Sequence, residues 1–221
     1  MKFQVPNSIL KLCCLLAFAS GVLGEYNVSY DFQNPERLPY RIEAATFVRD
    51  NTLYSYGGRK RDGEMMNSFD GFYLDSDTGE LVHKIIGIED TPASAGSAAV
   101  LLPDNNKVLF FGGNQSTSAD SLQNGSMLVM EYDFATGAWT ARPVFSGNAL
   151  PTNTESPTAA LAPNGNVYIY GGAYTNSTED IELRMATGVM WVYDPKTNLF
   201  SSVEVSRDVS EAFLGVPTVL P

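Results

Sequence analysis

Leu53-Tyr54-Ser55-Tyr56-Gly57-Gly58 is a short apolar and aromatic run closed by two glycines. The same pattern returns as Val108-Leu109-Phe110-Phe111-Gly112-Gly113 and as Val167-Tyr168-Ile169-Tyr170-Gly171-Gly172. A run of this length, rich in Val, Ile, Tyr and Phe, is typical of a strand buried on both faces. Paired glycines at its end suit a positive φ or a close approach of backbone. Three copies of the run predict a repeated fold.

A second apolar run and a polar turn follow each pair of glycines. The turns begin at Asp75, Asp133 and Asp194, and each has Thr in fourth place and Gly or Asn in fifth. This is the chemistry of a hairpin turn. A large apolar side chain lies two residues beyond each turn: Leu81, Trp139 or Phe200. A strand of small residues with its own polar turn precedes each Gly-Gly run, so each unit predicts a four-stranded antiparallel meander.

An apolar Gly-Gly strand followed by Tyr132 or Tyr193, and then by Trp139 or Phe200, resembles the kelch-repeat family of β-propellers. The copies recur about every 55–59 residues, near the kelch period. The resemblance covers roughly residues 41–221, and the first unit departs from it with leucines at the tyrosine and tryptophan positions. It implies an all-β fold, an incomplete propeller of about three four-stranded antiparallel blades plus the first strand of a fourth.

The expected blades cover residues 41–90, 91–149 and 150–207. Residues 25–40 are expected to form an N-terminal strand or linker. Residues 208–221 are expected to hold the first strand of a truncated fourth blade, because Gly215 to Pro221 aligns with the strands that end at Pro103 and Pro163. Propellers close with four to eight blades. Three blades therefore predict a piece of a longer kelch propeller.

Residues 1–24 have the pattern of a signal peptide. Lys2 and Lys11 flank its start, an apolar stretch covers residues 12–23, and small residues precede Glu25. The apolar stretch is shorter than the ~20 residues needed to span a bilayer. The chain is therefore expected to be secreted or displayed at the cell surface. Membrane attachment would need an uncleaved signal or a further C-terminal segment.

Cleavage of the signal would remove Cys13 and Cys14, the only two cysteines. The mature chain is then expected to have no disulfide and no thiolate ligand. The formal net charge is −11 and becomes more negative without Lys2 and Lys11. An acidic surface argues against nucleic acid or anionic lipid as partners.

Four sequons are candidate N-glycosylation sites on exposed loops of a secreted protein. Their asparagines are Asn27, Asn114, Asn124 and Asn176. Asn114 and Asn176 each follow a Gly-Gly pair, so they are predicted to occupy the same loop of successive blades.

The sequence predicts neither a metal site nor a cofactor. His83 is the only histidine, and one imidazole builds neither a His-rich metal site nor a Ser-His-Asp triad. The turn at Asp75 lacks the fifth oxygen ligand and the helices of a calcium-binding EF-hand. The glycine pairs lead into no helix N-terminus that could hold a phosphate. Four carboxylates near the Gly-Gly loops are expected to be solvated loop charges: Glu64, Asp70, Glu179 and Asp180.

Galactose oxidase shares the kelch propeller, so we compare the residues of its copper site with those that this chain offers. That site takes two tyrosines, two histidines and a cysteine joined to one tyrosine, whereas residues 25–221 offer one histidine and no cysteine. The tyrosines of the Gly-Gly strands are expected to be core residues: Tyr54, Tyr56, Tyr168 and Tyr170. We expect no catalytic constellation in residues 25–221.

The resemblance implies a non-enzymatic module that binds protein or glycan ligands. Binding residues concentrate in loops on a rigid scaffold, and the loops after Gly58, Gly113 and Gly172 differ most in length and sequence. Arg59, Lys60 and Arg61 form a basic group in the first of them, which is either a contact for an acidic partner or, as we favour, an ordinary loop. The alternative function is a fragment of a secreted propeller enzyme, galactose oxidase-like or other, with its catalytic residues in missing blades.

Overall fold

The computed structural model describes residues 41–87, 91–115, 126–178, 181–186 and 189–203. Every regular element in these ranges is a β-strand, which confirms the predicted all-β class. The same ranges contain no helix that is long and apolar enough to cross a membrane. The predicted signal peptide (1–24), the segment 25–40 and the predicted last strand (208–221) lie outside the described residues.

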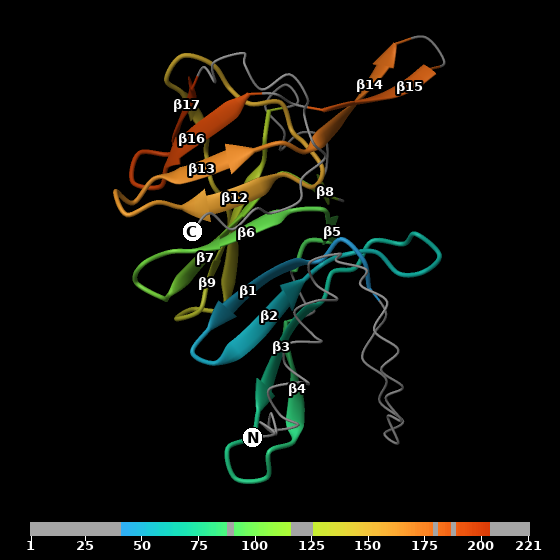
Figure 1. Cartoon of the computed structure of the whole chain (residues 1–221), viewed down its shortest axis with the longest axis vertical. Helices are drawn as coiled ribbons and strands as arrows, with labels where there is room; N and C mark the ends of the chain where they lie inside the picture. The colour runs from blue at the N-terminus through green and yellow to red at the C-terminus, as the bar shows by residue number, and fades with distance from the viewer. Residues whose placement is uncertain (1–40, 88–90, 116–125, 179–180, 187–188, 204–221) are drawn as a thin grey trace, which may run out of the picture.

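Three antiparallel four-stranded meanders, called blades 1, 2 and 3 below, form the body of the molecule (Figure 1). Blade 1 contains β1 (Ala45–Arg49), β2 (Thr52–Tyr56), β3 (Phe69–Leu74) and β4 (Leu81–Gly87). Blade 2 contains β6 (Ala98–Leu101), β7 (Lys107–Phe111), β9 (Val129–Asp133) and β10 (Ala138–Ala141). Blade 3 contains β12 (Thr158–Leu161), β13 (Val167–Tyr170), β16 (Met190–Asp194) and β17 (Leu199–Val203).

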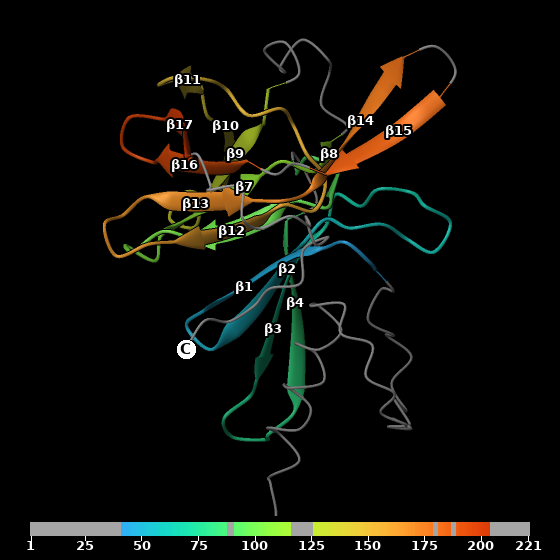
Figure 2. The same cartoon turned by 45° about the horizontal axis from the view of Figure 1, so that its top comes forward.

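Five shorter or projecting strands complete the described fold. The small strands β5 (Ser94–Ala95) and β8 (Asn114–Gln115) pair with each other, and β14 (Ala173–Thr178) forms a hairpin with β15 (Ile181–Ala186). This hairpin projects away from the blades (Figure 2). The strand β11 (Phe145–Ser146) adds to blade 3 by pairing in parallel with β17, an addition that the sequence pattern did not indicate.

Each predicted Asp-Thr turn is a side-chain-stabilised hairpin turn joining the third and fourth strands of a blade. The Asp75 carboxylate accepts the N–H groups of Asp77 and Thr78, both at 2.9 Å. Asp194 accepts the N–H of Lys196 at 2.9 Å. These backbone donors lower the pKa of both carboxyls, with Thr78 the largest cause for Asp75 and Lys196 for Asp194. The turn carboxylates therefore stabilise their own hairpin turns.

The hydrophobic core lies between successive blades. We call the face of a blade that packs on the following blade its forward face, and the opposite face its back face. Strand residues alternate between the two faces. The residues on both faces of the Gly-Gly strand β7 are buried, as its continuous apolar run predicted. The first interface combines Ala45, Phe47, Tyr54, Tyr56 and Phe69 of blade 1 with Val108, Phe110, Leu128, Met130 and Tyr132 of blade 2. The second combines Val100, Leu102, Leu109, Phe111, Met127 and Val129 of blade 2 with Val167, Ile169, Tyr193 and Phe200 of blade 3.

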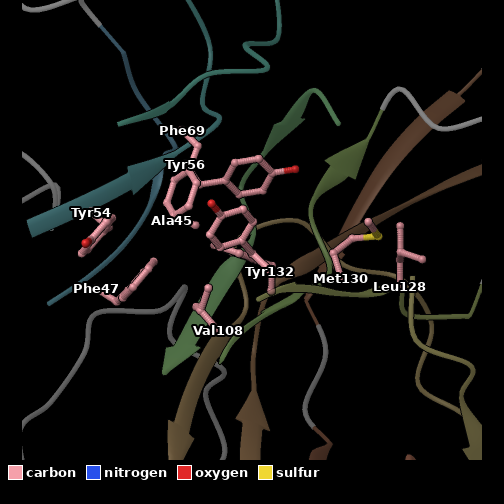
Figure 3. Packing of buried hydrophobic residues seen from close by; sticks show 10 residues of the cluster. Ala45, Phe47, Tyr54, Tyr56, Phe69, Val108, Leu128, Met130 and Tyr132 are labelled. Carbon is pink, nitrogen blue, oxygen red and sulfur yellow. The ribbon is translucent and has the colours of Figure 1, made fainter. Parts of the chain in front are cut away.

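Aromatic rings dominate the first interface, as Figure 3 shows. Phe69 of blade 1 meets Tyr132 of blade 2 edge to face, with ring centroids 4.9 Å apart. Trp139, on the fourth strand of blade 2, packs at 4.6 Å from the ring of Tyr56. Such pairs add about 0.5–1.5 kcal/mol each beyond the area they bury. The repeated large apolar residues of the sequence therefore hold one blade to the next.

Alkaline pH is expected to weaken this interface through Tyr56. Its hydroxyl donates to the carbonyl of Pro92 at 2.7 Å, and burial raises its pKa far above the ordinary value. A raised folded-state pKa gives stability that is fully present below the unfolded pKa of about 10 and is lost as the pH rises above it. The free energy of unfolding, measured with urea from pH 7 to 11, should fall above about pH 10.

Tyr56→Phe should flatten that fall, because the variant has no proton to lose at this position. It should also lower stability by about 1 kcal/mol at pH 7 through the lost hydrogen bond. Burial also raises the pKa of Tyr193 in the second interface, so part of the alkaline slope should survive. An unchanged slope in Tyr56→Phe would contradict the assignment.

Candidate functional site: the Gly-Gly face

The loops that follow the three Gly-Gly pairs gather at one end of the blades, which we call the Gly-Gly face (Figure 1). The strands β2, β7 and β13 all run toward this end, and β8 and the β14–β15 hairpin begin there. Blades 1 and 2 lead into it through residues 57–68 and 112–115. The loops predicted to carry binding residues therefore share one surface.

The first glycine of each pair has a positive φ, at 64° for Gly57, 67° for Gly112 and 71° for Gly171. A Cβ at Gly57 would lie 2.2 Å from the Ser94 carbonyl oxygen, and one at Gly112 would lie 2.4 Å from the Thr154 carbonyl oxygen. Both the backbone conformation and the close approach of the next blade therefore require glycine at Gly57 and Gly112.

A reciprocal pair of backbone hydrogen bonds joins blades 1 and 2 at this face. The second glycine, Gly58, donates its N–H to the Ser94 carbonyl at 2.7 Å. In return, Gly96 donates its N–H to the Glu43 carbonyl at 2.8 Å. We call this arrangement the blade joint.

The same joint recurs between blades 2 and 3. Gly113 donates to the Thr154 carbonyl at 2.7 Å, and Ser156 donates to the Gly96 carbonyl at 2.7 Å. Glu43, Gly96 and Ser156 all have a positive φ, at 58°, 70° and 56°. Two of them are not glycine, so local strain is retained where the blades meet. The joints set the backbone positions from which the Gly-Gly loops start.

Most of the predicted basic group is paired within the protein. Arg59 Nε lies 2.8 Å from Glu43 Oε2, and its Nη2 lies 3.8 Å from Glu155 Oε1. Lys60 Nζ lies 2.6 Å from Glu64 Oε2, and this carboxylate raises the pKa of Lys60. Exposed ion pairs of this kind contribute little stability. Arg59 nevertheless connects blade 1 with the segment that leads into blade 3.

Asn114 is the one predicted glycosylation site whose side chain the structure describes. It is exposed and lies in β8, directly after the second Gly-Gly pair, opposite Ala95. Asn176 lies in β14, also after a Gly-Gly pair, while Asn27 and Asn124 lie outside the described residues. A glycan at Asn114 would stand on the Gly-Gly face.

Asp70 is not a solvated loop charge, contrary to the sequence-based expectation. It lies in β3 at a register shift, and only 3% of its side chain is exposed. Its carboxylate pairs with the guanidinium of Arg41 and with His83 Nε2, the latter at 2.9 Å. Glu64 is exposed as expected, whereas Glu179 and Asp180 lie outside the described residues.

Neutral partners complete this buried network on the back face of blade 1. Arg41 also donates to Ser68 Oγ at 2.8 Å and to the Gly57 carbonyl at 3.3 Å. His83 stacks on Phe72 with ring centroids 4.9 Å apart. The carboxylate and the guanidinium satisfy each other, so the pair stabilises the fold of blade 1. No spacing rule links Arg41 to Asp70, which is why the sequence did not reveal the pair.

Tyr168 and Tyr170 also differ from expectation. Tyr54 and Tyr56 are core residues, with 8% and 1% exposure, but Tyr168 and Tyr170 are 36% and 37% exposed. They lie on the forward face of blade 3, opposite the face that packs on blade 2. Within the described residues no three His, Cys, Asp or Glu side chains are placed to hold a metal ion.

A family model described as the KLHDC2/KLHL20/DRC7 Kelch-repeats domain matches residues 33–219. No curated protein matches the chain. The matched range covers all three four-stranded blades. The chain therefore belongs to the family of KLHDC2/KLHL20/DRC7 kelch-repeat domains.

Proposed function

We propose that this chain is a secreted or cell-surface interaction module that binds a protein or glycan ligand on its Gly-Gly face. Membership of the kelch-repeat family supports the general part of this proposal, because such domains are in general non-enzymatic and commonly bind protein partners. The choice of face and the extracellular setting are our own inferences.

One observation carries the choice of face: three dissimilar loops start from equivalent positions, and blade joints fix the first two of these positions. The first loop closes on itself through Lys60 N–H to the Glu64 carbonyl at 2.9 Å and Met66 N–H to the Gly58 carbonyl at 2.8 Å. The second continues into β8, and the third becomes the projecting β14–β15 hairpin (Figure 2). Variable loops on a repeated scaffold are where recognition concentrates.

The face can be tested by adding a glycan to it. Asp62→Asn with Glu64→Ser creates a sequon at exposed position 62 of the first loop. Asn166→Thr creates a matched sequon at exposed Asn164, in a hairpin turn at the opposite end of blade 3. Ligands would be sought by applying the full chain to a glycan array and by testing the immobilised full chain against secreted proteins. Binding should be lost with the glycan at position 62 and kept with the glycan at Asn164, and the reverse would refute the proposal.

The signal-like residues 1–24 and the exposed Asn114 support the extracellular setting. In eukaryotic secretory cells the full chain is expected to reach the medium, to begin at Glu25 and to lose mass on treatment with an N-glycosidase. Asn114→Gln should remove one glycan from the mass spectrum. Retention inside the cell with an uncleaved and unglycosylated chain would contradict this setting.

A further inference from the structure

The hairpin turn between β12 and β13 contains an asparagine that is followed directly by a glycine. Asn164 is exposed, and a Cβ at Gly165 would meet no atom within 4 Å. Because glycine has no side chain, the Gly165 nitrogen is open to approach by the Asn164 side-chain amide. The turn lies at the end of blade 3 opposite the Gly-Gly face, so any chemistry here is separate from the proposed binding surface.

The turn already folds the Asn164 side chain over the backbone that follows it. Asn164 Oδ1 accepts the N–H of Asn166 at 3.0 Å, which is the bond of an Asx turn. Negative charge develops on this oxygen when a nucleophile adds to the amide carbon. The Asn166 N–H is therefore placed to stabilise the adduct, as the donor of an oxyanion hole does.

One contact opposes attack by the Gly165 nitrogen. The Gly165 N–H donates to the Ala162 carbonyl at 2.9 Å, so this hydrogen bond has to open before the nitrogen can lose its proton. The bond lies at the tip of a hairpin, where local opening costs little free energy. The turn therefore slows the attack but does not prevent it.

We propose that Asn164 is a site of spontaneous deamidation. The Gly165 nitrogen loses its proton and forms a bond to Asn164 Cγ. The bond from Cγ to the side-chain nitrogen breaks, and that nitrogen leaves with the proton as ammonia, which closes a cyclic imide. Water then opens either imide C–N bond and yields aspartate or β-linked isoaspartate. The only co-reactant is water, and the turn gains a negative charge.

Blade 2 shows that the fold accepts the aspartate product. Its aligned turn has Asp104 and Asn105 in place of Asn164 and Gly165. Asp104 Oδ1 accepts the N–H of Asn106 at 3.1 Å, the same bond that Asn164 makes in blade 3. The aspartate product should therefore leave the free energy of unfolding nearly unchanged. The isoaspartate product should destabilise the turn, because its backbone is longer by a methylene group.

Incubation of the full chain in mildly alkaline buffer, followed by peptide mapping with mass spectrometry, measures deamidation at each asparagine. Asn164 should convert at least about tenfold faster than Asn51, Asn105 and Asn198, which precede residues with side chains. Its peptide should also be labelled by an isoaspartate-specific methyltransferase. Asn124 precedes a glycine too but lies outside the described residues, and cleavage at Arg142 places it on a separate peptide.

Two variants that exchange the turn sequences of blades 2 and 3 provide matched controls. Gly165→Asn, which copies blade 2, should slow the conversion of Asn164 by about tenfold or more. Asp104→Asn with Asn105→Gly, which copies blade 3, should create a second reactive site at position 104. An unchanged rate in Gly165→Asn would overturn the proposal. So would an Asn164 that stays an amide in the folded protein but converts in guanidinium chloride, because the turn would then protect it.

Discussion

Gly112→Ala is expected to lower the free energy of unfolding by about 3 kcal/mol or more. The new Cβ would lie 2.4 Å from the Thr154 carbonyl oxygen. That oxygen already accepts the N–H of Gly113 at 2.7 Å, so it cannot retreat without breaking the joint between blades 2 and 3. The positive φ of 67° adds about 1–2 kcal/mol for any L-residue.

Gly165→Ala is the matched control for this prediction. Gly165 has a φ of 87°, and a Cβ there would meet no atom within 4 Å. The variant therefore isolates the loss of unfolding free energy that comes from the positive φ alone, about 1–2 kcal/mol. Urea unfolding of both variants and the parent protein measures the difference. If the two substitutions were equally harmful, the joint would contribute nothing and the close approach would be relieved by movement of the blades.

The repeat itself is what made the fold predictable. Each Gly-Gly pair marks the end of a buried second strand, and the alternation of residues in β7 places Val108 and Phe110 on one face and Leu109 and Phe111 on the other. Local pattern therefore predicts both the strands and the division of residues between faces. This is enough to predict a stack of antiparallel meanders.

Local pattern could not predict which faces are covered. Tyr54 and Tyr168 occupy the same place in their runs, yet Tyr54 is 8% exposed and Tyr168 is 36% exposed. The difference comes from the presence of a neighbouring blade, which is a property of the assembled stack. The parallel pairing of Phe145 with Leu199 escaped prediction for the same reason, because the two residues are far apart in the sequence.

The candidate site was predicted at the level of loops but not of contacts. The Gly-Gly loops do share one face, since equivalent positions in a repeat emerge at the same end of each blade. The pairing of Arg59 with both Glu43 and Glu155 depends on how blades 1 and 3 approach each other. The sequence therefore predicted a charged loop, but it did not predict the ion pairs that neutralise Arg59.

Asp70→Leu is expected to destabilise the protein by about 3–5 kcal/mol, because it leaves a buried guanidinium without its carboxylate. Arg41 and Asp70 have side chains that are only 9% and 3% exposed. Leucine has the same branched shape and leaves no cavity, and the corresponding position of blade 2, which pairs with Phe110 as Asp70 pairs with Ser55, is the apolar Met130. The Ser68 hydroxyl that also accepts from Arg41 is neutral and cannot replace the carboxylate.

The double variant Arg41→Met/Asp70→Leu decides whether the pair acts as a unit. Replacing both members of a buried ion pair by apolar residues is often neutral, so the double variant should recover most of the stability that Asp70→Leu loses. Urea unfolding of the parent, both single variants and the double variant gives the coupling energy. Additive losses would mean that water reaches Arg41 and solvates it independently. A strong coupling would mean that this polar network serves the back face of blade 1 in place of the apolar packing that blade 2 uses.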